Sequence, residues 1–510
     1  MLAKVLSGCV VGINAHPIEV EIDVSSGLPS FSVVGLPDTS IKESRDRIRS
    51  AIKNSGFAFP HGKITVNLSP ADLKKEGASF DMPIALGILS AAGAVDPESL
   101  FETIFCGELS LNGKIKPFRG AFPIALSLKT RCNSFILPER NAVEVSSLND
   151  ISAYGAKTLT DIVSHLKGIK PLEKASPKVP DPKSKISRNI LDFKDVKGQE
   201  YVKRGLEVSA SGGHNIILLG PPGSGKSMLA KRLPGIMPPL TLKESLEVTN
   251  VYSIAGEASC TSLIKDRPLR SPHHTISYAA MAGGGSNPLP GEITLAHNGI
   301  LFLDEFPEFR RDVLETLRQP LESGEITVTR VSRSLKFPSR FMLVAAMNPC
   351  PCGNFTDPNK NCNCTAYQIQ RYLSKVSGPL LDRIDIHLEV PRLNYNDLSR
   401  QRTGEHSSVI KDRVLKTREI QKIRFDKKNY ITSCNACMSS KDVEEYCTLS
   451  SEAEELLKTA VLELGISARA YDKILKISRT IADMDGSDTI QSHHLSEAVG
   501  YRSLDRNLWV

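Results

Sequence analysis

Three short apolar runs stand in the middle of the chain, and each ends in polar residues or glycine. They read HNIILLG (214–220), GILFLDE (299–305) and RFMLVAAMN (340–348). Unbroken apolar runs of this length are typical of strands buried on both faces, and stretches with helical spacing separate them. This alternation of strands and helices predicts an α/β core with a parallel sheet covered by helices.

The first 166 residues carry a second α/β pattern. The runs VEIDVSSGLPSFSVVGLP (20–37) and KITVNLSP (63–70) are rich in β-branched residues and bounded by glycine and proline, as strands are. The runs TSIKESRDRIRSAIKNSG (39–56) and DMPIALGILSAAG (81–93) show helical spacing instead.

Beyond residue 392 the sequence is polar with a helical periodicity. Two apolar stripes repeat at three- and four-residue spacing, which predicts amphipathic helices. One stripe consists of Leu456, Leu457, Ala460, Val461 and Leu464, and the other of Ile474, Ile477 and Ile481.

A lysine- and proline-rich segment separates the two α/β regions. Residues 167–188 hold six lysines and four prolines with little apolar periodicity, which indicates an extended, solvated linker. The predicted divisions are an N-terminal α/β domain (1–166), a linker (167–189), an α/β core (190–392) and a helical domain (393–510).

Composition narrows the class of protein without deciding its chemistry. The 510 residues are 40% hydrophobic, enough to build cores, and the net charge of +7 is compatible with a polyanion partner. Eleven scattered cysteines fit reduced thiols better than a disulfide framework. LSGC at 6–9 lacks the apolar stretch of a signal peptide, and no run is long enough to span a membrane. We therefore expect a soluble, cytoplasmic protein with no membrane partner.

The strongest chemical signal is GPPGSGKS at 220–227, between a predicted strand and a predicted helix. Its glycines let backbone N–H groups face phosphates, Lys226 reaches the outer phosphates and the Ser227 hydroxyl binds Mg²⁺. The helix N-terminus adds a favourable dipole. ATP and Mg²⁺ are therefore the expected cofactors. The expected nucleotide contacts are Gly220, Pro221, Pro222, Gly223, Ser224, Gly225, Lys226, Ser227 and Met228.

Two carboxylates end the second apolar run. Asp304 is expected to hold Mg²⁺ together with Ser227, and Glu305 to polarise the attacking water. Asn348 follows the third run, where it could orient that water, and Arg383 lies beside Asp382. Taken alone, an asparagine at a strand end or an arginine beside an aspartate is more often structural.

Five long motifs together resemble the AAA+ ATPases, and more closely the magnesium-chelatase-like ATPases of the YifB/ComM family. The resemblance extends over nearly the whole chain. The motifs are RSPHHTISYAAMAGGGSNPLPGEITLAHNGILFLDEFPEF (270–309), RQPLESGEITVTR (318–330), AAMNPCPCG (345–353), SGPLLDRIDIH (377–387) and SARAYDKILKISRTIADM (467–484).

The resemblance implies roles for individual residues. Asn348 would be the sensor-1 residue, Arg383 the arginine finger that reaches a neighbouring subunit's γ-phosphate, and Arg469 the sensor-2 arginine of a helical lid. FKDVKGQE (193–200) would line the adenine pocket. The implied core is an AAA+ αβα domain whose lid is the helical C-terminal region.

Two insertions bear on the substrate. Residues 323–338 predict a β-hairpin with Arg330 and Arg333 at or near its tip, and in related ring helicases such a hairpin touches nucleic acid in the pore. Residues 262–290 carry Arg267, Arg270 and the pair His273-His274. This segment is either a second pore loop, with Arg270 as a DNA contact, or a surface hairpin. Metal binding by the two histidines is disfavoured, because adjacent residues of a strand point to opposite faces.

The N-terminal region resembles the Lon-protease-like (S5-like) domain of the same family, through KKEGASFDMPIALG (74–87) and GELSLNGKIKPFRGAFPIAL (107–126). An active site of that kind needs a serine activated by a lysine. Ser79 stands at the serine position, but Phe122 occupies the lysine position. We therefore expect no peptidase activity.

One loop of the predicted core concentrates cysteines as C-x-C-x9-C-x-C. Cys350, Cys352, Cys362 and Cys364 could form a closed tetrahedral zinc site. Free thiols and a redox or iron–sulfur site remain as alternatives, since C-x-C pairs are less typical of zinc than C-x2-C pairs. The pair Cys434 and Cys437 has no second pair near it in sequence.

Together these features predict a Mg²⁺-dependent ATPase that forms a ring, expected to be a hexamer, and moves DNA through its pore. The resemblance implies branch migration in recombination or natural transformation, on single-stranded or branched DNA. One alternative is a chelatase-like metal-insertion or protein-remodelling motor. An ATP-dependent protease is a second, weaker alternative because of Phe122.

Overall fold

The computed structural model describes residues 2–75, 77–177, 191–257, 263–285, 288–330, 333–357, 360–393, 404–426 and 434–502. Internal contacts divide the chain into two compact units. The first unit consists of Met1–Ser184 with Leu242–Ile264, and the second unit of Lys185–Thr241 with Lys265–Val510. Residues 178–189 of the predicted linker lie outside the described residues. No helix within the described ranges is both long and apolar enough to cross a membrane.

The first unit is built on a seven-stranded sheet in the order β3-β4-β2-β1-β5-β8-β9. β2 pairs antiparallel with β1 and β4, and the other neighbours are parallel. The strands are β1 (Leu2–Val11), β2 (Asn14–Ser25), β3 (Ser30–Val34), β4 (Lys63–Ser69), β5 (Thr103–Phe105), β8 (Ser134–Pro138) and β9 (Ser152–Ala156), with β6 (Glu108–Leu109) and β7 (Ile115–Lys116) as a separate ladder. The helices are α1 (Thr39–Lys42), α2 (Ser44–Asn54), α3 (Asp81–Ala91), α4 (Ala121–Leu128), α5 (Glu139–Val145), α6 (Leu159–Leu166) and α9 (Leu242–Ala255).

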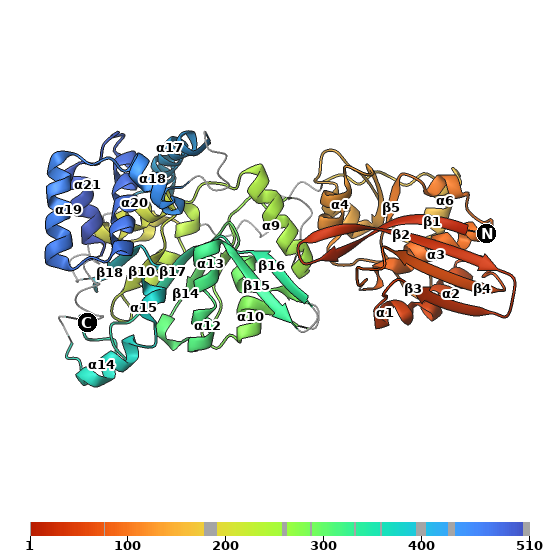
Figure 1. Ribbon diagram of the computed structural model, residues 1–510, viewed down its shortest axis with the longest axis horizontal. Helices are drawn as coiled ribbons and strands as arrows, with labels where there is room; N and C mark the ends of the chain where they lie inside the picture. The colour runs from red at the N-terminus through yellow and green to blue at the C-terminus, as the bar shows by residue number, and fades with distance from the viewer. Residues whose placement is uncertain are drawn as a thin grey trace. The chain divides into compact units, whose positions relative to one another are not determined.

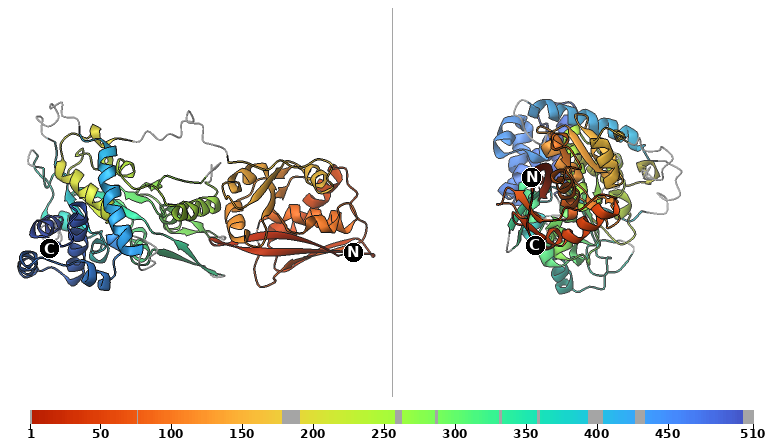
Figure 2. Two further views of the ribbon diagram at one scale, coloured as in Figure 1. Left: turned by 90° about the horizontal axis from the view of Figure 1, so that it is seen from above. Right: turned by 90° about the vertical axis from the view of Figure 1, so that its right-hand side faces the viewer.

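Alternating burial along the strands explains this sheet. In β4, Ile64, Val66 and Leu68 are buried, and the residues between them are exposed or half-buried. Side chains of a strand alternate between its two faces, so one face of β4 needs an apolar cover. α3, all of whose residues are buried, packs against β1 and β2, and the left view of Figure 2 shows orange helices of this unit on one side of the red strands. The predicted α/β character of the N-terminal region is confirmed.

Helix α9 comes from the middle of the chain but folds with the first unit. The Asn250 side chain donates a hydrogen bond to the Ile13 carbonyl (Nδ2–O 3.0 Å), and the Gly120 N–H donates to the Ser253 carbonyl (N–O 3.3 Å). Leu246 packs on the apolar cluster that contains Phe122. The first unit is therefore completed by residues that lie, in sequence, between the phosphate-loop motif and Asp304.

The second unit contains a five-stranded parallel sheet in the order β11-β14-β17-β10-β18 (Figure 1). Its strands are β11 (Leu269–Arg270), β14 (Ile300–Leu303), β17 (Met342–Met347), β10 (Ile216–Leu219) and β18 (Ile386–Glu389). The three predicted apolar runs form β10, β14 and β17, and all residues of these strands are buried. Two short ladders stand apart from this sheet: β12 (Gly283–Gly284) with β13 (Leu289–Pro290), and β15 (Glu325–Arg330) with β16 (Arg333–Pro338).

Helices complete the second unit. Those around the sheet are α7 (Glu200–Gly212), α8 (Lys226–Ala230), α10 (Tyr278–Ala282), α11 (Glu292–Leu295), α12 (Arg311–Glu315), α13 (Arg318–Ser323), α14 (Ala366–Leu373) and α15 (Gly378–Leu381). The C-terminal ones are α17 (Ser407–Asp426), α18 (Ser440–Tyr446), α19 (Ser451–Leu464), α20 (Ala468–Met484) and α21 (Ser492–Gly500). Ile474, Ile477 and Ile481 are buried in α20, so the predicted stripe is a core face that shares one apolar cluster with the sheet.

A buried ion pair joins helix α20 to the end of the loop before β18. Lys473 Nζ lies 2.9 Å from Asp385 Oδ1, and the Asn215 N–H donates to Asp385 Oδ2 at 3.0 Å. Burial would raise the pKa of Asp385, but the Lys473 ammonium and the neighbouring His214 outweigh it and hold the pKa below its usual range. The pair fixes the helical region to the sheet.

Candidate nucleotide-binding site

The predicted functional residues meet at one edge of the five-stranded sheet. Gly220 follows β10, Asp304 follows β14 and Asn348 follows β17. The strands are parallel and in register, with Leu219 opposite Met347 and Leu303 opposite Ala345, so their carboxyl ends lie at the same edge. Ligands of open parallel sheets bind at this edge.

The loop from 220 to 227 has the backbone of a phosphate cradle. Gly223 and Gly225 have φ values of 79° and 92°, in the left-handed region that glycine tolerates best. A Cβ on Gly220 would lie 2.2 Å from the Val390 carbonyl oxygen, so only glycine fits there. Lys226 and Ser227 open helix α8, as the sequence predicts.

Lys226 points back into this loop. Its ammonium donates to the carbonyl oxygens of Gly220 (2.6 Å) and Pro221 (2.9 Å) and to Asn348 Oδ1 (3.1 Å). Burial lowers the pKa of Lys226 to about 8, and the nearby Asp304 carboxylate offsets part of that effect. A phosphate anion in the loop would supply the negative charge that the buried ammonium needs.

Ser227 and Asp304 fit a magnesium ion. The Ser227 hydroxyl donates to Asp304 Oδ2 at 2.5 Å, so two hard oxygen ligands already converge. Mg²⁺ takes oxygen ligands, commonly one or two carboxylates plus phosphate oxygens and water. The donor set therefore suits the metal that the phosphate-loop motif implies.

The backbone of Glu305 has a left-handed conformation, with φ of 53°. Its backbone N–H donates to Asp304 Oδ1 at 3.0 Å, and its side chain is 56% exposed. His274 Nδ1 lies 2.9 Å from Glu305 Oε2. This contact is not among the predictions made from the sequence, which weigh the two adjacent histidines only as metal ligands.

The arrangement of the histidine pair differs from the strand geometry assumed for it. The rings of His273 and His274 lie side by side, with centroids 4.1 Å apart and planes tilted by 35°, and do not point to opposite faces, because strand β11 ends at Arg270. His273 Nδ1 is 2.9 Å from the Thr275 hydroxyl, whereas His274 Nδ1 faces Glu305.

The segment 193–200 reaches the phosphate loop. Gln199, at the start of α7, donates from Nε2 to the Ser224 carbonyl (2.8 Å) and to the Pro391 carbonyl (3.1 Å). Phe193 and Val196 are buried in the core below it. The segment that we expect to hold the adenine therefore braces the loop that would hold the phosphates.

Arg383 and Arg469, the predicted arginine finger and sensor-2 residue, contact protein groups away from the phosphate loop. Arg383 donates to the Glu322 carboxylate and to the Pro379 carbonyl. Arg469, at the start of α20, is 68% exposed and lies 3.9 Å from Asp382. None of these contacts is with the phosphate loop.

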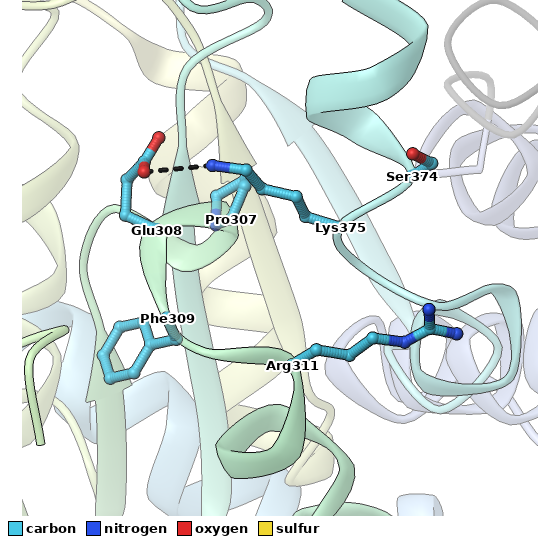
Figure 3. A pocket seen from close by; sticks show the side chains of 6 residues that line it. All are labelled: Pro307, Glu308, Phe309, Arg311, Ser374 and Lys375. Carbon is cyan, nitrogen blue, oxygen red and sulfur yellow. Dashed lines mark hydrogen bonds and ion pairs between the residues drawn. The ribbon is translucent and has the colours of Figure 1, made fainter. Parts of the chain in front are cut away.

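A surface pocket lies directly after Glu305. The turn Phe306–Glu308 brings Glu308 against Lys375, with Nζ 3.1 Å from Oε2. Figure 3 shows Lys375 and Arg311 on one side of this turn and Phe309 directed away from them. Lys375 follows α14, so this pair links the Glu305 strand to the segment after the four-cysteine loop.

The four predicted cysteines come together. Their sulfur atoms all lie within 4.8 Å of one another, and Cys350, Cys352 and Cys362 form a triangle with sides of 3.4, 3.6 and 3.7 Å. These separations exceed a disulfide bond of about 2.0 Å. They match the edge of about 3.8 Å expected for a tetrahedron with Zn–S bonds of about 2.3 Å. The second pair, Cys434 and Cys437, lies elsewhere with its sulfur atoms 3.3 Å apart.

The predicted DNA-contact arginines have different surroundings. The hairpin β15–β16 forms as predicted, with Arg330 opposite Arg333, but the side chains of both lie outside the described residues. Arg270 lies in β11 and makes a two-point contact with Glu292, at 2.6 Å for each nitrogen–oxygen pair. Arg267 donates to the carbonyls of Pro238 and Asn298, both at 2.7 Å.

In the first unit, Ser79 and Phe122 belong to different surroundings. Ser79 lies in a short 3-10 turn before α3, and its carbonyl accepts the Gly107 N–H at 2.8 Å. Phe122 is fully buried in α4, inside an apolar cluster. A phenyl ring at this place supplies no base for Ser79.

Three family profiles match successive parts of the chain. They are described as subunit ChlI of Mg-chelatase (residues 20–141), magnesium chelatase, subunit ChlI (residues 192–398), and magnesium chelatase, subunit ChlI C-terminal (residues 404–502). The matched regions cover both units and include every residue of the nucleotide site described above.

Individual relatives align end to end. The competence protein ComM of Haemophilus influenzae is 45% identical over 511 residues, covering 99% of this chain and 98% of the relative. The protein YifB of Escherichia coli is 45% identical over 509 residues with the same coverage. The magnesium-chelatase 38 kDa subunit of Rhodobacter capsulatus is 28% identical over 180 residues, covering 32% of this chain and 51% of the relative. With 45% identity to ComM and YifB over nearly its full length, the chain belongs to the YifB/ComM family of magnesium-chelatase-like AAA+ proteins.

Proposed function

We propose that this protein is a ring-forming, Mg²⁺-dependent ATPase that acts on DNA as a branch-migration helicase. The observation that carries the ATPase part is the meeting of Lys226, Ser227, Asp304, Glu305 and Asn348 at one sheet edge. The family supports ATP and Mg²⁺ as cofactors. Phosphoryl transfer asks a protein mainly for positioning and charge stabilisation, and these residues supply both.

Each residue has a defined task in this proposal. The backbone N–H groups of 223–227 and the Lys226 ammonium would hold phosphate oxygens, while Ser227 and Asp304 would hold the metal, which would supply positive charge to the phosphates. Glu305 accepts the proton of the attacking water. Asn348, which contacts Lys226 at 3.1 Å, keeps the ammonium at the inner end of the loop.

Arg383 and Arg469 are the residues on which we base the proposal of a ring. In an AAA+ ring, expected to be a homo-hexamer, Arg383 would contact the nucleotide of the neighbouring subunit. Arg469, on the C-terminal helices, would contact the nucleotide of its own subunit. Arg383 is held by Glu322 in the single chain, so that pair has to open before Arg383 reaches a phosphate. An arginine supplied in this way raises the turnover number by about 10³-fold or more in related enzymes.

DNA is the substrate best supported by the β15–β16 hairpin and by relatives. The hairpin is a separate two-stranded ladder that places Arg330 and Arg333 at its turn. ComM, identical at 45% of positions, is named a competence protein, which fits recombination in natural transformation. Arg270 contributes to DNA binding only if its pair with Glu292 opens.

We also propose that the four-cysteine loop binds a structural zinc ion. The tetrahedral spacing of the sulfur atoms supports it. Backbone N–H groups at Asn354 and Asn363, together with neighbouring thiols, lower the pKa of Cys352 to about 6, whereas burial raises the pKa of Cys350 to about 12. Zinc binding would therefore displace a proton from Cys350. Reduced thiols and ATP both suit a cytoplasmic protein.

The alternative functions have less support. A metal-insertion motor is favoured by the chelatase profiles, but two magnesium-chelatase subunits align with only 32% and 59% of this chain, at 28% and 24% identity, against 99% at 45% identity for ComM. An ATP-dependent protease would need a lysine where Phe122 is buried.

The proposal is tested by ATPase assays on the full chain with single-stranded DNA, duplex DNA and a four-way junction, alongside native mass measurement. The expected result is Mg²⁺-dependent hydrolysis, faster with one of these DNAs, in a hexameric assembly. If none of these DNAs changes the hydrolysis rate or the assembly state, the DNA part of the proposal would be overturned and the metal-insertion or protein-remodelling motor would remain.

A further inference from the structure

We propose that Cys434 and Cys437 form a redox-active dithiol, which exchanges with low-molecular-weight disulfides and closes into a reversible intramolecular disulfide. No role predicted from the sequence involves this pair, and the proposed ATPase does not use it. In a chain whose cysteines are otherwise those of a reduced protein, a C-x2-C pair fits a transient redox site better than a structural disulfide.

The two sulfur atoms lie on one tight turn, 3.3 Å apart. Cys434 caps the short 3-10 helix η6 (Asn435–Cys437), and the Cys437 N–H donates to the Cys434 carbonyl at 3.1 Å. A turn closed in this way keeps its first and fourth Cα atoms within about 7 Å, and a disulfide needs a Cα separation of about 4.4–6.8 Å. The bond can therefore form with only a small movement of the backbone.

Asn435, which follows the first cysteine, fixes this turn to two helices. The residue is fully buried, and its N–H donates to Gln421 Oε1 of α17 at 3.1 Å. Its Nδ2 donates to Thr480 Oγ1 (3.1 Å) and to Asp483 Oδ2 (2.8 Å), both on α20. The turn is therefore held in place, and the two thiols with it.

The sulfur of Cys434 shares its surroundings with a cation. Arg418 of α17 donates from Nε and Nη2 to the Ala210 carbonyl, at 3.2 and 2.9 Å, so its guanidinium is fixed at the C-terminal end of α7. A Cβ built on Gly213 would lie 3.0 Å from Cys434 Sγ and 3.3 Å from Arg418 Nη2. The thiol and the guanidinium thus meet beside a glycine that leaves room for both.

These neighbours favour the thiolate of Cys434. The Cys437 thiol donates to Cys434 Sγ and the Arg418 cation adds to its effect, so the pKa of Cys434 falls to about 5 although burial opposes this. The thiolate is the form that attacks disulfides. Cys437 is exposed, whereas every other described cysteine outside the four-cysteine loop is buried. One of these, Cys447, has its pKa raised by burial to about 12.

Metal binding is the alternative use of two close thiols. A structural zinc ion takes four protein ligands. In the part of the chain that the structure describes, no third histidine, cysteine or carboxylate side chain joins this pair as a ligand, in contrast to the four-thiol cluster. Dithiol chemistry therefore fits the pair better.

The reaction is an exchange in two steps. The Cys434 thiolate attacks one sulfur of a small disulfide R–S–S–R, which forms a mixed disulfide and releases one R–S⁻. The Cys437 thiol then loses its proton and attacks Cys434 Sγ, which closes the intramolecular bond and releases the second R–S⁻. The two cysteines lose two electrons in total, and the small disulfide is reduced to two thiols.

Disulfide exchange on the full chain tests the inference, with alkylation and peptide mass spectrometry reporting each cysteine. Excess oxidised glutathione should produce a disulfide between Cys434 and Cys437, and dithiothreitol should reverse it. Cys437→Ser should stop at a glutathione adduct on Cys434, because the second thiol is absent. Cys447→Ser is the matched control, which removes a buried thiol outside the pair, and should form the disulfide at a rate within about twofold of the unmodified chain.

The pH dependence of alkylation separates an activated thiolate from two thiols that merely lie close together. Between pH 8 and pH 6 the reaction of Cys434 with iodoacetamide should slow by about twofold or less, whereas an ordinary thiol slows by about 75-fold. Arg418→Lys keeps a cation and should keep this flat profile, and Arg418→Met should steepen it.

Three results would overturn the inference. They are a pair that stays reduced in oxidised glutathione, a Cys437→Ser variant that forms no adduct on Cys434, and a pH profile of Cys434 as steep as that of an ordinary thiol. None of these measurements depends on ATP hydrolysis, so their outcome is independent of the proposed function.

Discussion

Gly353 of the four-cysteine loop packs directly against Pro222 of the phosphate loop. A Cβ built on Gly353 would lie 2.5 Å from Pro222 Cδ, and its φ of 79° is left-handed. The Gly353 N–H also donates to Cys350 Sγ at 3.2 Å. The thiol cluster and the phosphate loop are therefore in direct contact, so we expect a change in the conformation of one to alter the conformation of the other.

This contact predicts that metal loss weakens nucleotide binding. Purified protein should hold about one zinc per chain, as expected for a four-thiolate site. Cys350→Ser with Cys362→Ser should release the zinc and raise the KM for ATP severalfold, because Gly353 no longer supports Pro222. Elemental analysis and ATP titration of the same samples check both results.

Cys437→Ser is the matched control, since Cys437 lies outside the four-thiol cluster, and should leave zinc content and KM unchanged. Less than about half an equivalent of zinc under reducing conditions contradicts a structural site. If the Cys350→Ser, Cys362→Ser variant loses its zinc but keeps the same KM for ATP, the coupling to the phosphate loop would be contradicted.

Substitutions at Lys226 and Glu305 should separate nucleotide binding from hydrolysis. Lys226→Ala removes the buried ammonium and should abolish tight ATP binding. Glu305→Gln should keep binding but lower kcat by about 10²-fold or more, because the proton acceptor is lost. Fluorescent-nucleotide binding and phosphate release measure the two effects. Lys231→Ala is the control, because Lys231 is exposed at the C-terminal cap of the same helix. Unchanged hydrolysis in both variants would remove the central claim.

The sequence predicts the sheet edge well because its signals are local. Strand β10, the glycine loop and Lys226 are contiguous, and the apolar runs before Asp304 and Asn348 are short, which favours buried strands over helices. Parallel pairing then brings Gly220, Asp304 and Asn348 together without further information.

Contacts that depend on three-dimensional packing could not be predicted in this way. Helix α9 has an ordinary helical sequence, and three-dimensional contacts such as the Asn250–Ile13 and Gly120–Ser253 hydrogen bonds show that it folds with the first unit. The His274–Glu305 contact depends on the register between β11 and β14, which a two-residue strand does not reveal in sequence. The spacing of charged residues along the sequence likewise does not predict the Arg270–Glu292 ion pair.

The hairpin arginines should govern the response to DNA. Arg330→Ala with Arg333→Ala removes two cations at the turn of β15–β16, so DNA stimulation of the ATPase should fall. The slope of log binding constant against log salt should decrease by up to about 2, since each phosphate contact contributes about 0.9. Lys336→Ala is the control, because Lys336 is 73% exposed on the same hairpin and lies 3.7 Å from Glu325. Equal effects of the two substitutions would indicate a general loss of positive charge.

The Asp385–Lys473 pair should make the second unit sensitive to acid. The pKa of Asp385 lies below its usual value of 3.8 in the folded chain, so its stabilisation is complete above about pH 5 and is lost as pH falls below 3.8. In that range the unfolded chain binds a proton that the folded chain does not, and the free energy of unfolding decreases. Lys473→Met should cost about 3 kcal/mol at pH 7, because it leaves a buried carboxylate without its cation.

Urea unfolding at pH 7, 5 and 3.5 measures this difference. The gap between the unmodified chain and Lys473→Met should shrink as pH falls, since the variant lacks the cation that depresses the Asp385 pKa. Lys476→Met is the matched control on α20, where the ammonium lies 3.4 Å from the Ala436 carbonyl, and should cost less than about 1 kcal/mol at every pH. A gap that stays constant from pH 7 to 3.5 would mean that Lys473 acts through packing of its carbon chain and not through the Asp385 charge.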